Sequence, residues 1–307
     1  MKLHVHVGVH KTATTYLQGQ LSKKKQQLNQ AGVGAMGLGE FRPFFTRHLM
    51  ELPVGQFRIE DHLEKFFGDG VPDDISGLIL SDENLIGLCN GFISYGKAYR
   101  GSDERLNRLR ELLAGHEVTM FMAIRSYDSF TSSAYCEAMR HTQQFVRFNA
   151  FRTKFDIESL RWPAMIGRFV AALQPAEVKL WRFEDFRQHS DSIFKALAFG
   201  ADVGKQPEQP KAERQSFSAA AVSVLETLAK RHGPKTAAEL VDAVSEGLPK
   251  GPGKGEYPAF DPWTAAEHQS MTSLYDEDCA AIPAKYWLVP PGAPVGAEKR
   301  SQVAAVA

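Results

Sequence analysis

The chain has 307 residues, of which 43% are hydrophobic and 23% are charged, so it is not a disordered chain, a collagen-like fibre or a coiled coil. Lysine and arginine number 36, and aspartate and glutamate also number 36, which leaves no formal net charge. Proteins that coat duplex DNA usually carry a basic excess, so we expect no nucleic-acid partner. A neutral total still allows a local basic pocket.

The three cysteines, Cys89, Cys136 and Cys279, are widely spaced and odd in number. This pattern fits neither a disulfide framework nor a zinc ribbon, and it favours a reduced, cytoplasmic setting. The first residues lack the apolar stretch of a signal peptide. No run of about 18 apolar residues occurs, so we expect no membrane span.

Strands alternate with helices in the hydrophobic pattern, which predicts an α/β fold with a central parallel sheet flanked by helices. Residues 3–7 form the first expected strand, and a tight loop over residues 8–13 follows it. A helix then runs to Gly32, with Thr14 or Thr15 as its N-cap. We predict further strands at residues 33–38, 77–81, 117–124 and 178–183, and helices at residues 59–67, 103–114, 128–143 and 157–173.

Domain organisation is expected to be simple. Residues 1–289 are predicted to form one domain. Residues 290–307 are rich in proline, glycine and alanine, which predicts a flexible C-terminal tail. Residues 249–255 have the composition of a flexible basic loop. The oligomeric state does not follow from the sequence.

The loop after the first strand has the setting of an anion site. A loop that leads from a strand into a helix presents unpaired N–H groups at the positive end of the helix dipole. Lys11 adds a full positive charge, and Thr12, Thr14 and Thr15 add hydroxyl donors. The spacing is not that of a Walker A loop, and an ordinary turn with a capping threonine is the alternative interpretation.

Residues 6–18, HVGVHKTATTYLQ, resemble the 5′-phosphosulfate loop of sulfotransferases, whose bacterial and carbohydrate-specific members carry a pattern close to G-x-x-K-T-G-T-T-x-L-Q. Ala13 stands where this pattern has glycine, and we expect a negative φ at that residue. The resemblance implies that the donor nucleotide is held by Gly8, Lys11, Thr12, Ala13, Thr14 and Thr15.

Later segments resemble the same family in the same order along the chain. Arg125, followed eight residues later by Ser133, is similar to the family's 3′-phosphate site, although Tyr127 replaces the usual proline. Taken alone, this segment is also read as a surface arginine with a helical serine. Residues 179–187 and 193–200 resemble the strand and helix around the family's "YEDF" sequence, which we interpret as scaffold.

The segment from Lys250 to Asp261 is similar to the nucleotide-covering loop of carbohydrate sulfotransferases. Its glycines permit close approach of the backbone to a ligand. The resemblance implies nucleotide contacts from Lys250, Gly251, Lys254 and Tyr257, and leaves open which lysine covers the phosphates. Without the other segments, a disordered basic loop is an equal alternative.

Carboxylates follow the predicted strand at residues 77–81, where ligands bind in open α/β sheets. Related bacterial sequences resemble S-x-E-N at this point, so Glu83 is the first candidate for the general base. Asp82 and His10 are the reserves, and the alternative role of Glu83 is to cap the next helix.

Two other patterns are weaker. His4 and His6 have the spacing of a metal pair, but they lie inside a strand, so we expect them on one packed face. Residues 32–37 spell GxGxxG, yet they follow a helix and enter a strand, which reverses the dinucleotide-binding context. The aromatic and basic segment 140–155 either lines an acceptor cleft or packs on the core.

The resemblance as a whole implies a sulfotransferase with a three-layer, P-loop-like fold. Its donor is 3′-phosphoadenosine 5′-phosphosulfate (PAPS), its product is 3′-phosphoadenosine 5′-phosphate (PAP), and no metal is expected. The acceptor is a hydroxyl of a carbohydrate, a glycolipid or a small alcohol. A P-loop-like small-molecule kinase and a non-catalytic nucleotide- or glycan-binding module are the alternatives.

Overall fold

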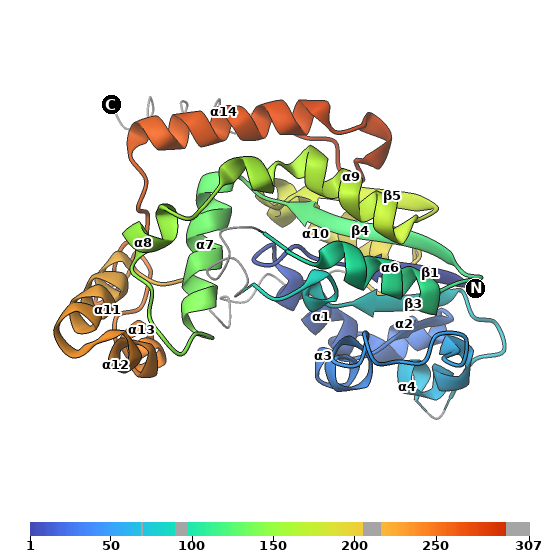
Figure 1. Ribbon diagram of the computed structural model, residues 1–307. Helices are drawn as coiled ribbons and strands as arrows, with labels where there is room; N and C mark the ends of the chain where they lie inside the picture. Colours follow the sequence, from blue (N-terminus) through green and yellow to red (C-terminus); the bar gives the residue numbers. More distant parts are fainter. Residues whose placement is uncertain (69, 90–97, 205–215, 293–307) are drawn as a thin grey trace.

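A five-stranded parallel sheet lies at the centre of the computed structural model, which describes residues 1–68, 70–89, 98–204 and 216–292 (Figure 1). Its strand order is β2-β3-β1-β4-β5, and each adjacent pair is parallel. This arrangement confirms the predicted α/β class. The strands are β1 (Lys2–His6), β2 (Val33–Ala35), β3 (Gly77–Ser81), β4 (Glu117–Ile124) and β5 (Glu177–Arg182).

The strands are buried on both faces, as their nearly continuous apolar runs require. Successive side chains of a strand point to opposite faces, so Leu78 and Leu80 enter one cluster and Ile79 enters the other. The Ile79 cluster receives apolar side chains from α1 (Thr14–Lys23), α2 (Lys25–Gln30) and α10 (Phe183–Leu197). The opposite cluster receives them from α6 (Ser102–Leu112), α7 (Tyr127–Met139), α9 (Trp162–Leu173) and α14 (Ala265–Ala281). Helix α14 runs along the upper edge of Figure 1.

The helices are short to medium in length. Their bounds are α1 (Thr14–Lys23), α2 (Lys25–Gln30), α3 (Leu38–Phe41), α4 (Leu63–Phe67), α6 (Ser102–Leu112), α7 (Tyr127–Met139), α8 (Phe148–Arg152), α9 (Trp162–Leu173), α10 (Phe183–Leu197), α11 (Ala219–His232), α12 (Pro234–Glu239), α13 (Val241–Gly247) and α14 (Ala265–Ala281).

Several predicted helices and strands are shorter than expected. The first helix breaks at Lys24, whose backbone leaves helical geometry and whose ammonium donates to the Val203 carbonyl at 2.6 Å. The strand expected over residues 33–38 ends at Ala35, because Gly37 already begins the turn into α3. The helix expected over residues 157–173 is a 3₁₀ turn followed by α9, with a proline in the first turn of α9.

The loop after β1 lies at the point where the sheet reverses its direction of growth. From β1 the chain moves toward β2 on one side, whereas from β4 it moves to β5 on the other side. Pairing between these two strands continues past the end of β1, because Val7 N–H donates to Phe121 O at 3.0 Å and Val9 N–H to Ala123 O at 3.3 Å. Ligands of open α/β sheets bind at this kind of reversal.

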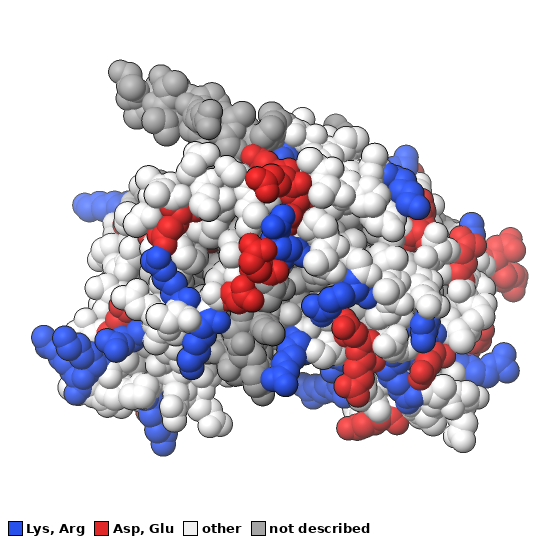
Figure 2. Space-filling view, turned by 45° about the horizontal axis from the view of Figure 1, so that its top comes forward, with Lys and Arg blue, Asp and Glu red and all other residues white. Residues whose placement is uncertain are grey.

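The surface shown in Figure 2 carries basic and acidic side chains interspersed, in keeping with the neutral total charge. Within the described ranges, no helix is both long and apolar enough to cross a membrane. The three cysteines are buried and unpaired. Of the predicted tail, residues 293–307 lie outside the described residues, and the division at residue 289 stays a prediction.

Two glycines provide a test of the packing of α10 on the sheet. A Cβ at Gly77 would lie 2.3 Å from a ring carbon of Phe199 and 2.7 Å from the Lys2 carbonyl oxygen. Gly77→Ala is therefore expected to lower the free energy of unfolding by about 1–3 kcal/mol. Gly19 lies in α1 with open space around it. Gly19→Ala is the control, and it is expected to raise stability by up to about 1 kcal/mol.

Urea unfolding of the two variants measures both changes. Equal stability of Gly77→Ala and the unmodified chain would contradict the described contact between the end of α10 and β3.

Candidate functional site

The loop that joins β1 to α1 has an unusual backbone. Lys11 and Ala13 both adopt the left-handed conformation, with φ of 64° and 66°. The negative φ expected at Ala13 is therefore wrong. Ala13 is also the N-cap of α1, in place of Thr14 or Thr15, because its carbonyl accepts from Tyr16 N–H and Leu17 N–H at 3.1 and 3.2 Å. Left-handed non-glycine residues are strained, and such strain concentrates at functional loops.

The amides of this loop form a row of donors. The backbone N–H groups of residues 11–15 have no hydrogen-bond acceptor among the described residues. Successive unpaired amides in a loop with left-handed residues are typical of backbone sites that bind anions. The dipole of α1 adds to the positive potential there. The Thr12 hydroxyl, which the sequence predicts to be a donor to an anion, instead donates to Val9 O at 2.6 Å and stabilises the loop.

Gly8 brings this loop against the end of β3. Its φ is 96°, and a Cβ at this position would lie 2.8 Å from the Cβ of Glu83. Both the backbone conformation and the close approach require glycine here. The anion loop and the candidate base are therefore in direct contact.

Arg125 stands at the carboxyl end of β4 and reaches into the loop after β1. Its Nη1 donates to the Lys11 carbonyl at 2.7 Å, and its Nε donates to Ser129 Oγ at 3.0 Å. The guanidinium lies over the Phe183 ring, 4.3 Å from the centroid. Burial lowers the pKa of Arg125, whereas the negative charges of Glu184 and Asp128 raise it by less. Ser133 is buried on α7, but the hydroxyl that contacts Arg125 is that of Ser129.

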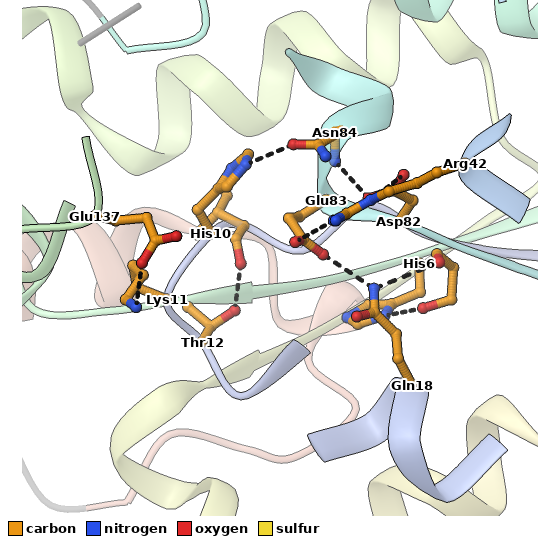
Figure 3. A network of polar contacts seen from close by, with 12 residues as sticks. His6, His10, Lys11, Thr12, Gln18, Arg42, Asp82, Glu83, Asn84 and Glu137 are labelled. Carbon is orange, nitrogen blue, oxygen red and sulfur yellow. Dashed lines mark hydrogen bonds and ion pairs between the residues drawn. The ribbon is translucent and has the colours of Figure 1, made fainter. Parts of the chain in front are cut away.

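Lys11 is paired with a carboxylate that the sequence did not single out. Its Nζ lies 3.1 Å from Glu137 Oε2 on α7, with both side chains mostly shielded from solvent (Figure 3). Burial alone would raise the pKa of Glu137. The charge of Lys11 and hydrogen bonds from Lys11 and His141 outweigh it and lower this pKa to about 2.

The loop after α13 contributes a third cation. Lys250 forms a β-bridge with Tyr257, and Tyr257 N–H donates to Pro249 O at 2.9 Å. Burial lowers the pKa of Lys250, and the positive charges of Arg125 and Lys11 lower it further. Lys250 therefore lies close to the other two cations, whereas Lys254 is exposed at the surface. Of the two candidate lysines, the structure brings Lys250 to the site.

Asp82 and Glu83 differ in their surroundings. Asp82 is completely buried and caps the 3₁₀ turn Glu83–Ile86 by accepting from Asn84 N–H at 3.0 Å. It also accepts a two-pronged contact from Arg42, from Nε at 3.1 Å and from Nη2 at 2.9 Å. These contacts make Asp82 a structural carboxylate, and they show that Glu83 is not the cap.

Glu83 is held by two partners. Its Oε1 accepts from Arg42 Nη2 at 2.8 Å, and its Oε2 accepts from Gln18 Nε2 at 2.9 Å. Burial opposes ionisation of Glu83, but His10, Arg42 and the hydrogen bonds hold its pKa below the usual range. The side chain keeps a small exposed fraction of 13%, compared with none for Asp82. Glu83 is thus an ionised carboxylate that a ligand is able to reach.

His10 lies between the two groups of charges (Figure 3). Its Nδ1 is 3.0 Å from Tyr99 Oη, and its Nε2 is 3.0 Å from the Asn84 side-chain amide. With the amide nitrogen of Asn84 facing His10, its oxygen accepts from Arg42, which satisfies both ends. Burial lowers the pKa of His10, whereas the charges of Glu83, Asp82 and Glu137 raise it by less.

The other histidines are part of the core. His4 stacks on Phe199, with ring centroids 3.5 Å apart, and His6 Nδ1 is 2.9 Å from Ser81 Oγ. Burial lowers the pKa of His6 to about 4. Both rings belong to the face covered by α10, as the strand periodicity predicts. In the described part of the chain, no cluster of three or more His, Cys, Asp or Glu side chains is placed to hold a metal ion.

Two other weak patterns have structural explanations. Gly32 ends the turn after α2 with a φ of 71°, and β2 follows at once, as the order of helix and strand predicts. In the segment 140–155, Phe145, Phe148 and Phe151 are buried in the main core. That segment therefore packs on the core.

Five residues of the site were not predicted: Gln18, Arg42, Tyr99, Ser129 and Glu137. Gln18 is the last residue of the sulfotransferase-like loop pattern, so its place in that pattern could have identified it as a site residue. Arg42 lies 40 residues from the Asp82 it contacts, and Glu137 lies 126 residues from Lys11. Nothing in the local sequence indicates either pairing.

A groove of about 460 Å³ opens beside α1 and shares Gln18 with the site. Its lining consists of Thr15, Gln18, Gly19, Ser22, Lys25 and residues 37–40.

Comparisons of the chain with protein-family models, with curated proteins and with solved structures gave no match. The geometry of the site is therefore the basis for assigning a function.

The left-handed conformation at Ala13 yields a stability prediction. Ala13→Gly removes the strain of a Cβ at positive φ, so we expect the free energy of unfolding to rise by about 0.5–1 kcal/mol. Ala229→Gly in the helical interior of α11 is the control, and it is expected to lower stability by about 1 kcal/mol. Thermal or urea unfolding measures both. A loss of stability in Ala13→Gly would contradict the described loop.

Proposed function

We propose that the chain is a sulfotransferase that moves the sulfuryl group of PAPS to an acceptor hydroxyl. The observation that carries this proposal is the gathering of Lys11, Arg125 and Lys250 beside the row of amides at residues 11–15. Neither Arg125 nor Lys250 has a carboxylate within ion-pair distance among the described residues. Partly buried cations without a counter-ion are costly, and a polyanionic ligand offsets that cost.

The anionic groups of PAPS correspond to separate parts of the site. The loop amides and Lys11 would bind the 5′-phosphate and sulfate, since helix N-termini and lysine suit phosphate oxygens. Arg125 would bind the 3′-phosphate, with Ser129 or Ser133 beside it, because guanidinium forks match phosphate geometry. Lys250 and the backbone of Gly251 would cover the nucleotide. The parallel sheet and the loop after β1 are consistent with a three-layer, P-loop-like fold.

Transfer would proceed by in-line attack. The acceptor oxygen forms a bond to sulfur, and the bond between sulfur and the bridging phosphate oxygen breaks. The acceptor proton passes to Glu83, and the electron pair of the broken bond stays on PAP. Lys11 stabilises the charge that develops on the leaving oxygen. Glu83 supports the role of base because it is ionised, reachable and in contact with Gly8.

The acceptor class comes from the sequence resemblance alone and is a carbohydrate, a glycolipid or a small alcohol. A small-molecule kinase is the second enzyme class, but the loop does not have the G-x-x-x-x-G-K-[ST] pattern that holds ATP and Mg²⁺, because it is shorter and His10 stands in place of the glycine before Lys11. A non-catalytic binding module would use the same cations without needing Glu83.

PAP binding tests the cation cluster. We expect PAP to bind with micromolar or tighter affinity, and Lys11→Ala or Arg125→Ala to weaken it at least about tenfold, because each removes a charged hydrogen bond worth about 1.5–3 kcal/mol. Lys250→Ala is expected to weaken binding by a smaller factor. Lys254→Ala is the matched control and is expected to change little, since Lys254 is exposed.

Isothermal titration calorimetry at fixed salt measures these affinities. If PAP fails to bind at high micromolar concentration while ATP with Mg²⁺ binds, the kinase alternative replaces this proposal.

Glu83→Gln separates an enzyme from a binding module. We expect this variant to bind PAP normally and to lose about 10²–10⁴-fold in turnover, because the amide cannot accept the acceptor proton. A screen of hydroxyl acceptors with sulfur-labelled PAPS provides the assay. Full transfer by Glu83→Gln would exclude Glu83 as the base, and absence of transfer in the unmodified chain despite PAP binding would favour the module.

A further inference from the structure

Of the three cations Lys11, Arg125 and Lys250, Lys11 has a carboxylate within ion-pair distance among the described residues, and that carboxylate is Glu137. Its Oε2 is 3.1 Å from Lys11 Nζ, and its Oε1 is 3.2 Å from His141 Nε2. The exposed fractions of the Lys11 and Glu137 side chains are 19% and 15%, so the pair is largely shielded from water. A shielded ion pair interacts more strongly than a surface pair.

This ion pair involves Lys11, whose ammonium group is needed by the proposed function. Lys11 Nζ is the ammonium that would face the phosphosulfate, yet in the structure it faces Glu137 (Figure 3). An ammonium has three donors, so it is able to contact two acceptors at once. A second anion on Lys11 would, however, lie a few ångströms from an ionised carboxylate, and like charges at that separation repel.

We propose that Glu137 is the counter-ion of Lys11 when no nucleotide is bound and that the nucleotide displaces it. This inference rests on the proposed function and adds a residue that sets the affinity of the donor site. Glu137 offsets one of three positive charges, so it lowers the affinity for a polyanion. When PAP leaves, Lys11 forms its ion pair with Glu137 again, which favours product release.

The decisive comparison is PAP binding to the unmodified chain and to Glu137→Gln, by calorimetry at fixed pH and salt. We expect Glu137→Gln to bind PAP about tenfold more tightly or better, since it removes a competing charged hydrogen bond. Glu137→Asp keeps the charge and is expected to stay closer to the unmodified affinity. Asp242→Asn, at an exposed position on α13, removes the same charge from a carboxylate that pairs with Arg140 and not with Lys11, and it is expected to change little.

A second measurement needs no variant at Glu137. The carboxyl carbon of Glu137, followed by NMR in the unmodified protein, is expected to titrate at higher pH with saturating PAP than without it. Lys11→Met is expected to raise the same pKa without any ligand, because both remove the ammonium from the carboxylate.

The outcomes separate the two claims. Equal or weaker PAP binding by Glu137→Gln, with an unchanged Glu137 pKa on saturation, overturns the role of Glu137 while leaving the sulfotransferase proposal intact. Failure of PAP to bind either protein contradicts both. Tighter binding in Glu137→Gln, with no such gain in Asp242→Asn, supports the displacement.

Discussion

The site depends on the parallel pairing of β1 with β4, which continues beyond the end of β1. Ala123 N–H donates to Gly8 O at 2.6 Å, and Val9 N–H donates to Ala123 O at 3.3 Å, so the first residues of the loop after β1 are held by the neighbouring strand. Arg125 follows two residues later and donates to the Lys11 carbonyl. Because the ladder fixes both ends of this contact, the loop has little freedom to relax. The left-handed residues at positions 11 and 13 are tolerated under this constraint.

Charge is divided unevenly around this loop. On the α7 side, Lys11, Arg125 and Lys250 lie near one another, and Lys11 forms an ion pair with Glu137. On the β3 side, Asp82 and Glu83 share one arginine, Arg42. His10 lies between them, and both of its ring nitrogens are in hydrogen-bond contact. Under the proposed function, the anionic donor would bind on the α7 side, and Glu83 would accept the proton on the β3 side.

The sequence predicted the features that depend on local periodicity and missed those that depend on distant contacts. The strands at residues 77–81 and 117–124 have the predicted bounds, because apolar runs buried on both faces leave no other reading. The position of the loop at the end of β1 followed from the order of strand and helix. The left-handed φ of Ala13 did not follow from the sequence, because alanine prefers negative φ and the pairing with β4 overrides that preference. Glu137 and Arg42 reach their partners across the fold, and no spacing rule connects them.

The neutral total charge of the chain is compatible with a local site for an anion. A chain with 36 basic and 36 acidic residues has no general attraction for polyanions, and its charges are mixed over the face shown in Figure 2. Selectivity for one small anion therefore has to come from a few groups at short range. Such groups act within a Debye length of about 8–10 Å, so surface charges elsewhere contribute little. A carboxylate placed inside that radius has a large effect on affinity, and Glu137 is placed there. Under the proposed function, such a site would favour a concentrated charge, such as a bisphosphorylated nucleotide, over an extended one.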